Sequence, residues 1–240
     1  MTYAAAVTPA AYGAAMAHNP ARRIAALLLI GQFAAMWGAF FILAPAIDWP
    51  ASLDLPPAES LPLIGAQSSA VFAGYLSYLV HALLLIPIAA LTPQALGLGD
   101  RRGRTAMLLG GLAGFAKALG IVRWIFLMPG LAIAYTAPET DAATRAAIGV
   151  VYEAFNVYAG GVGEILGVGL FAGLWTLILS SALIASGSRI LGGAGIFAAL
   201  MLFTTLPSVI EIEHPILLTL SGVVWQLWTL ALAIHLWRRA

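Results

Sequence analysis

The chain of 240 residues is 62% hydrophobic and 9% charged, with a net charge of +1 and no cysteine. Soluble domains carry about 25% charged residues, so this composition excludes an ordinary water-soluble domain. The small net charge gives no electrostatic basis for binding nucleic acid. The lack of cysteine excludes disulfides, thiolate catalysis and Cys-ligated metal.

Long apolar runs recur along the chain, and runs of about 18 residues or more are typical of transmembrane helices. Backbone polar groups in lipid must be satisfied within their own segment, which favours helices. The strict alternation of a membrane β-barrel is missing. We therefore predict an all-α polytopic transmembrane helix bundle with the lipid bilayer as its surroundings. A cytoplasmic tail at 1–23 precedes a single transmembrane domain at 24–240.

Three apolar runs occupy the first half of the chain. The run 24–47 is longer than the apolar region of a signal peptide, which has about 7–15 residues, so we interpret it as the first span. A Pro-rich, acidic loop is expected at 48–69. The second span follows at 70–91, where Pro87 predicts a kink because proline lacks a backbone N–H. The third span is expected at 105–134.

The second half contains one apolar stretch, 146–185, that is too long for a single crossing. At ~1.5 Å per residue it measures roughly 60 Å, about twice the hydrocarbon core of ~30 Å. We therefore predict a break near Gly160, with an extra interfacial helix before it and the fourth span at 162–185 after it. The fifth and sixth spans are expected at 190–210 and 216–236.

The basic residues are distributed unevenly over the ends of the predicted spans. One side carries Arg145 and most of the acidic residues, whereas the other side carries Arg22, Arg23, Arg101, Arg102, Arg104, Arg189, Arg238 and Arg239. Basic residues concentrate in cytoplasmic loops. This asymmetry predicts six spans with both termini in the cytoplasm.

Four charged residues lie where the sequence otherwise indicates membrane interior. Lys117 and Arg123 belong to the third span, and Glu153 and Glu164 lie on or beside the fourth. An ionisable residue at this depth costs roughly 2.5–3.5 kcal/mol on insertion scales and usually faces a partner inside the bundle. We predict the ion pairs Arg123–Glu153 and Lys117–Glu164. Glu153 and Glu164 are eleven residues apart, so an unbroken helix would put them on one face, with Asn156 near the same face. We call these five residues the polar seam.

Three interpretations of the polar seam remain open. The first is a structural network of ion pairs that fixes helix packing. The second is a buried pocket for an anionic or amphiphilic ligand, or a proton relay. The third is that Glu153 and one cation extend to the membrane interface. Buried ion pairs are often no more stable than apolar replacements, so packing alone does not fully explain the seam.

Three further residues are candidates for contact with a ligand or pigment. His81 lies about halfway along the second span, where a histidine can ligate haem or relay protons. A hydrogen-bonded packing role is the alternative. Trp225 and Trp228 lie in the sixth span, where they either pack or line a ligand pocket.

Sites for metal and for catalysis are sparse in this sequence. Glu211, Glu213 and His214 alternate in the last outer loop, where they could bind a metal or simply be solvated. We assign no metal site to them. The sequence contains no HExxH, P-loop or GxSxG motif.

Several short motifs resemble those of a known family. They are Gly114-Phe115 in the third span, the tail from Trp228 to Trp237, Arg22-Arg23-Ile24, and Ser188-Arg189-Ile190-Leu191 with Gly195-Ile196. On these motifs the chain resembles a widespread bacterial family of six-helix integral membrane proteins, catalogued only as a domain of unknown function. The resemblance implies a multi-pass protein of the bacterial inner membrane, with no activity to transfer. Where that family has Arg and Glu after Gly-Phe, this chain has Ala116 and Leu119, with Lys117 between them.

Two functional hypotheses follow from this sequence. The first is a non-enzymatic accessory or structural subunit of a membrane complex, with other membrane subunits as partners. The alternative is binding or transport of a small amphiphile or ion through the polar seam.

Overall fold

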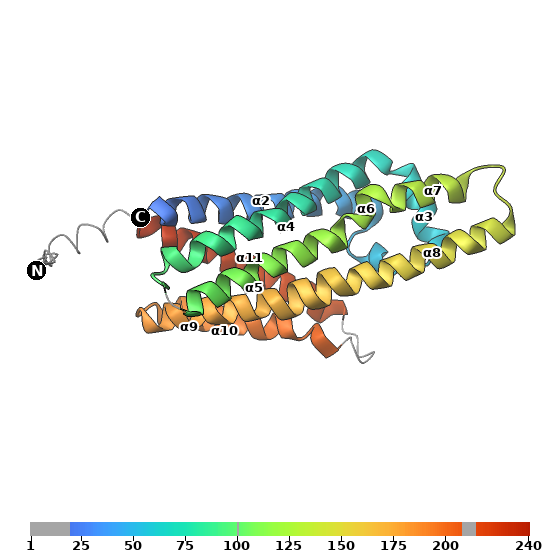
Figure 1. Cartoon of the computed structure of the whole chain (residues 1–240). Coiled ribbons are helices and arrows are strands. Elements are labelled where there is room, and N and C mark those ends of the chain that lie inside the picture. Colours follow the sequence, from blue (N-terminus) through green and yellow to red (C-terminus); the bar gives the residue numbers. More distant parts are fainter. Residues whose placement is uncertain (1–19, 100, 208–214) are drawn as a thin grey trace, which may run out of the picture.

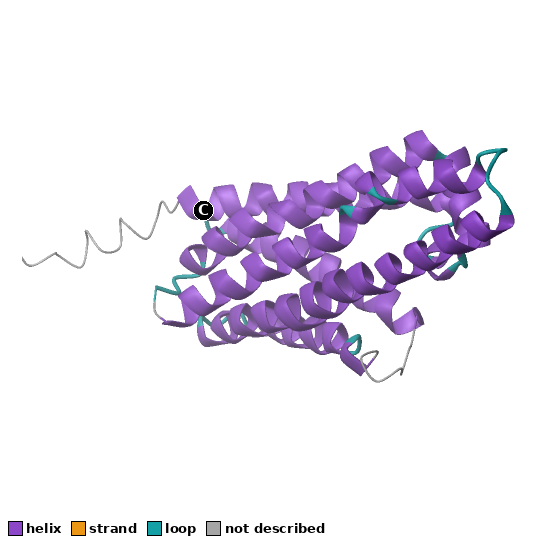
Figure 2. Cartoon of the chain, turned by 45° about the vertical axis from the view of Figure 1, so that its right-hand side comes forward, coloured by secondary structure: helices purple, strands orange, loops and turns teal. Residues whose placement is uncertain are grey.

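The computed structural model describes residues 20–99, 101–207 and 215–240, and helices account for nearly all of them (Figures 1 and 2). No strand occurs in these ranges. The elements are α2 Pro20–Ile47, η1 Ala51–Asp54, α3 Pro57–Ala66, α4 Ser68–Ala95, α5 Arg101–Ile121, α6 Arg123–Phe126, α7 Met128–Thr136, α8 Ala142–Gly160, η2 Gly161–Ala172, α9 Gly173–Ala185, α10 Arg189–Phe203 and α11 Pro215–Arg238. The predicted all-α class is confirmed.

Five helical runs are long and apolar enough to cross a membrane. They are α2, α4, the α5–α7 run, the α8–η2–α9 run and residues 219–238 of α11. The predicted fifth span corresponds to α10, which has 15 residues. At ~1.5 Å per residue α10 measures roughly 22 Å, less than a hydrocarbon core of ~30 Å. The chain therefore has the helices of a multi-pass membrane protein, while the sixth crossing stays a prediction.

The predicted break near Gly160 is wrong. Gly160 and Gly161 both keep right-handed helical dihedral angles (φ −59°, ψ −52° and φ −56°, ψ −43°), so the helix continues from Ala142 to Ala185 without a separate interfacial helix. The hydrogen-bond register changes instead, because η2 is a π-helix of 12 residues. Such segments are rare and often occur at functional sites.

The α7–α8 hairpin projects from one end of the bundle (Figure 1). Asp141 caps the start of α8, where its Oδ1 accepts a hydrogen bond from the backbone N–H of Thr144 at 2.7 Å. This hydrogen bond to the ionised carboxylate lowers the pKa of Asp141. The cap supplies an acceptor for one of the backbone donors that a helix N-terminus leaves without a partner.

Other predicted boundaries also change. The loop expected at 48–69 contains η1 and α3, because Pro57 suits the first turn of a helix and Leu61 and Ile64 are buried against α7. The α5–α7 run is interrupted at Val122 and again at Leu127. The second interruption comes just before Pro129, which cannot donate a backbone hydrogen bond. By contrast, α4 runs through Pro87 without ending.

The basic ends of several helices meet at one end of the bundle, where α2 begins and α11 ends (Figure 1). Arg22 connects three of these ends. Its Nε donates to the carbonyl oxygen of Ala95 at 3.1 Å, and its Nη1 donates to that of Arg239 at 2.7 Å. Arg22 was expected in a tail but lies in the first turns of α2.

Two glycines allow α5 and the α8–η2 run to pack with their backbones in contact. A Cβ atom on Gly120 would lie 2.8 Å from the carbonyl oxygen of Ala159 and 2.9 Å from Cα of Gly163. Small residues permit this approach in membrane bundles. The same contact brings the cationic α5–α6 region against Glu164.

We expect Gly120→Ala to destabilise the fold by about 1–3 kcal/mol, because the added methyl group meets backbone atoms that cannot rotate away. Gly111→Ala is the matched control on the same helix, since a Cβ there meets nothing within 4 Å. Denaturant unfolding in detergent micelles measures both. Equal stability of the two variants would contradict the packing described here.

Candidate ligand cavity

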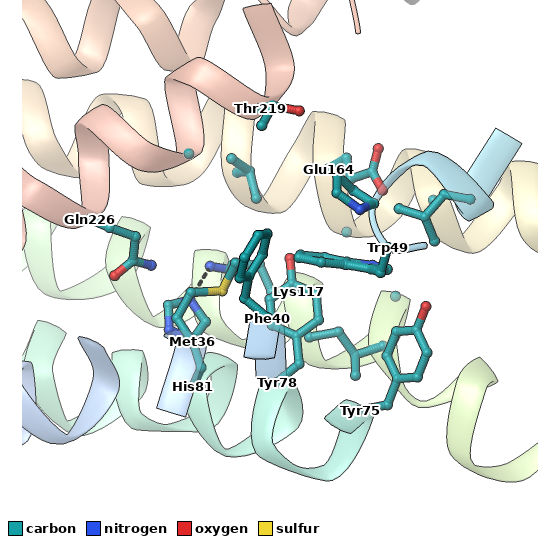
Figure 3. Close-up of a pocket in the computed structure, with 18 of the residues that line it drawn as sticks. Met36, Phe40, Trp49, Tyr75, Tyr78, His81, Lys117, Glu164, Thr219 and Gln226 are labelled. Atoms are coloured by element: carbon teal, nitrogen blue, oxygen red, sulfur yellow. Dashed lines mark hydrogen bonds between the residues drawn. The ribbon is translucent and has the colours of Figure 1, made fainter. Parts of the chain in front are cut away.

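A cavity of about 300 Å³ lies inside the bundle (Figure 3). It sits where two hydrophobic cores meet, because residues of both cores line it. Its wall is mainly apolar and aromatic, and its polar lining includes His81, Lys117, Arg123, Glu164 and Gln226. The volume is at the lower end of the range of about 300–1,000 Å³ for small-molecule sites, and the mixture of lining groups is typical of them.

Lys117 and His81 form a buried hydrogen bond in this wall. Lys117 Nζ lies 2.8 Å from Nε2 of His81, and both side chains are buried (Figure 3). His81 is held in turn by α2, because its Nδ1 lies 3.0 Å from the carbonyl oxygen of Gln32. The Gln32 side chain donates back to the carbonyl oxygen of His81 at 3.2 Å. The pair is therefore fixed on two sides.

Arg123 is held by neutral acceptors. Its Nη1 donates to the carbonyl oxygen of Gly120 at 2.6 Å, and its Nη2 donates to Oδ1 of Asn156 at 3.1 Å. Asn156 is fixed by its own bond to the carbonyl oxygen of Leu53 at 3.1 Å. The guanidinium also stands 5.2 Å from the ring centre of Trp124, a cation–π distance.

The two predicted ion pairs do not form. Glu153 is exposed, because the neighbouring Tyr152 is the residue of α8 that faces the interior, where its hydroxyl donates to Ser60 Oγ at 2.7 Å. Glu164 is half-buried on η2 and lines the cavity, but Lys117 bonds to His81 instead. Glu153 and Glu164 therefore lie in different surroundings, one exposed and one half-buried. Glu164 does interact electrostatically with Arg123.

Several buried polar atoms of lining residues have no hydrogen-bond partner within the described ranges. They are Nε1 of Trp37, Nε1 of Trp49, the hydroxyl of Tyr75, Nε of Arg123 and Oε1 of Gln226. Most of these atoms can donate. A buried donor without an acceptor costs about 1–3 kcal/mol, so a ligand that accepts hydrogen bonds would gain from binding here.

The two tryptophans predicted as ligand contacts have different surroundings. Trp225 lines the cavity, donates through Nε1 to Thr176 Oγ1 at 2.8 Å, and lies 5.0 Å from Lys117 Nζ. Trp228 is not part of the lining; its Nε1 donates to the carbonyl oxygen of Leu191 at 3.1 Å, and its ring packs against Trp175. Trp228 therefore has a packing role.

The residues around His81 do not fit an axial haem or pigment ligand. Both ring nitrogens already have partners, and coordination through Nε2 would separate it from Lys117. In the part of the chain that the structure describes, no group of three His, Cys, Asp or Glu could hold a metal. Glu211, Glu213 and His214 lie outside the described residues.

No protein-family model, curated protein or solved structure matches this chain. The resemblance to the bacterial six-helix family therefore stays a prediction.

Sequence reasoning missed part of the lining. Trp37, Trp49 and Tyr75 were not singled out as ligand contacts, because aromatic residues are common in membrane helices. The amides of Gln32 and Gln226 were a usable signal, since each stands alone within an apolar run. An uncharged polar group at membrane depth also needs a partner.

Proposed function

We propose that this chain is a six-span protein of the bacterial inner membrane that binds a small amphiphile in the cavity. The ligand has an apolar body and a head that accepts hydrogen bonds, such as a carboxylate or a carbonyl group. The observation that carries the proposal is the set of buried donors without partners, Arg123 Nε among them, on residues that line a largely apolar cavity.

The proposed orientation places both ends of the chain in the cytoplasm. It is supported by the grouping of Arg22, the α4–α5 connection, Arg189 and the C-terminus at one end of the bundle (Figure 1). Asp54, at the end of η1, and Glu139, in the connection between α7 and α8, lie toward the other end (Figure 1). In this proposal the α10 segment supplies the remaining crossing.

The polarity of the cavity distinguishes ligand classes. Lys117 and Arg123 lie in its wall together with one carboxylate, that of Glu164. A cationic head would meet the two basic groups and find few acceptors, whereas an anionic head would meet several donors. The hypothesis of an accessory subunit stays a prediction.

Native mass spectrometry of the purified protein released from detergent micelles tests the proposal. We expect decanoate to bind saturably as one molecule per chain, decanol to bind more weakly, and decylammonium not to bind above background. Binding of decylammonium as tightly as decanoate, or no saturable binding of any of them, would overturn the proposed function.

A further inference from the structure

Lys117 is the only lysine in the chain, and the other ten of its eleven basic residues are arginine. It lies in the wall of a membrane-interior cavity and is only 5% exposed. A guanidinium stays protonated in proteins, whereas a lysine amine can lose its proton and act as a nucleophile. The one position with this chemistry is therefore inside the proposed ligand site.

The partners of His81 fix its tautomer. A carbonyl oxygen only accepts hydrogen bonds, so the bond to Gln32 requires a proton on Nδ1. In neutral His81, Nε2 then carries the lone pair that accepts from Lys117 Nζ. Transfer of one proton along this 2.8 Å contact makes the Lys117 amine neutral and His81 an imidazolium. The two N–H groups of the imidazolium then have acceptors, the carbonyl oxygen of Gln32 and the Lys117 amine. His81 is thus placed to take the proton that Lys117 must lose.

Within the described ranges, no carboxylate forms a salt bridge with Lys117. Such a carboxylate would hold the Lys117 amine as an ammonium ion. The other titratable groups around the cavity are Tyr75 and Tyr78 on α4, Arg123 on α6 and Glu164 on η2. Arg123 adds a positive charge to the same cavity, so the Lys117–His81 pair holds no more than one proton beyond its neutral form.

We propose that Lys117 forms an imine with an apolar aldehyde bound in the cavity, and that His81 moves the proton. This inference rests on the proposed function. His81 accepts a proton from the ammonium, the amine lone pair forms a bond to the aldehyde carbon, and the carbonyl electron pair goes to oxygen. The oxygen takes a proton from nitrogen and a second one from the imidazolium and leaves as water, while nitrogen forms the second bond to carbon. The sum is ammonium plus aldehyde to protonated imine plus water, and His81 ends in its neutral form.

The surroundings favour the imine once it has formed. The lining is largely apolar, so water needed for hydrolysis is scarce. Trp225 presents its ring 5.0 Å from Nζ, and an aromatic face stabilises a cation such as a protonated imine.

Reductive trapping tests the inference. The purified protein is treated with decanal and sodium cyanoborohydride, and the modified residue is mapped by peptide mass spectrometry, which separates Lys117 from the N-terminal amine. The matched control is K117R/R145K, which moves the single lysine to an exposed position outside the cavity. We expect Lys117 to be labelled at least about tenfold faster than the lysine of the control. We expect the labelling rate of Lys117 in H81Q to be about tenfold lower than in the unchanged chain.

Labelling of Lys117 no faster than the exposed lysine overturns the proposal. That comparison needs no change at His81, so it holds even where H81Q fails to fold, as judged by circular dichroism and size exclusion. An unchanged rate in folded H81Q overturns the role of His81. Decanoate binding separates the two proposals: binding without labelling rejects the imine alone, whereas loss of both rejects the ligand cavity as well.

Discussion

His81→Leu will reduce the unfolding free energy by about 3 kcal/mol, and adding Lys117→Met to the same chain will restore most of the loss. The reason is that leucine leaves the buried Lys117 amine without its acceptor. Leaving a buried donor without its acceptor costs about 1–3 kcal/mol, and more when the group is charged, whereas replacing both partners with apolar groups of similar shape can be nearly neutral. The Lys117 amine is charged when protonated but can lose its proton, so we expect the upper end of that range.

Denaturant unfolding in micelles of both single variants and the double variant measures this coupling as a double-mutant cycle. Ser77→Ala is the matched control, because Ser77 lies on the same helix as His81, and its Oγ donates to the carbonyl oxygen of Ala35 on α2 at 2.8 Å. Losing that neutral hydrogen bond should cost about 1 kcal/mol. Additive effects of His81→Leu and Lys117→Met would show that the two residues do not stabilise each other.

The fold class was predictable because apolar run length determines whether a segment can lie in lipid. Helix ends were less predictable. A span predicted from hydropathy ends at the first polar residues, but the backbone of α4 stays helical from Ser68 to Ala95, beyond the predicted 70–91. The interruption of the third run at Leu127 and the continuity at Gly160 were both missed. Glycine pairs suggest breaks, yet Gly160 stays helical between Ala159 and Gly163, which pack on Gly120 of α5.

The candidate site was predictable in composition but not in pairing. Lys117, Arg123, Asn156 and Glu164 do lie at one cavity or support it. Opposite charges suggested direct ion pairs, but the pairing depends on which way each helix face points, and Glu153 lies on an exposed face of α8 while Lys117 bonds to His81. The contact of Lys117 with His81 could not be foreseen by charge matching, because both are basic residues.

Arg123→Met will weaken decanoate binding by at least about tenfold, equivalent to about 1.4 kcal/mol. The guanidinium is the only cation of the cavity with a buried N–H group that has no partner in the described structure. A charged donor to a carboxylate is stronger than a neutral one. Arg123→Lys should recover part of the affinity, because lysine keeps the charge but not the planar set of donors.

We expect Asn156→Leu to weaken decanoate binding less than Arg123→Met does and more than Arg145→Met does. It removes an acceptor that orients Arg123, and it also removes the bond from Asn156 to the carbonyl oxygen of Leu53. Arg145→Met is the control, because Arg145 is exposed and bonds to the carbonyl oxygen of Tyr135 outside the cavity. Native mass spectrometry gives the affinities, and circular dichroism verifies that each variant is folded. If folded Arg123→Met and Arg145→Met bind decanoate equally well, the ligand head does not lie at Arg123, and the donors of Trp37 and Trp49 become the alternative contacts.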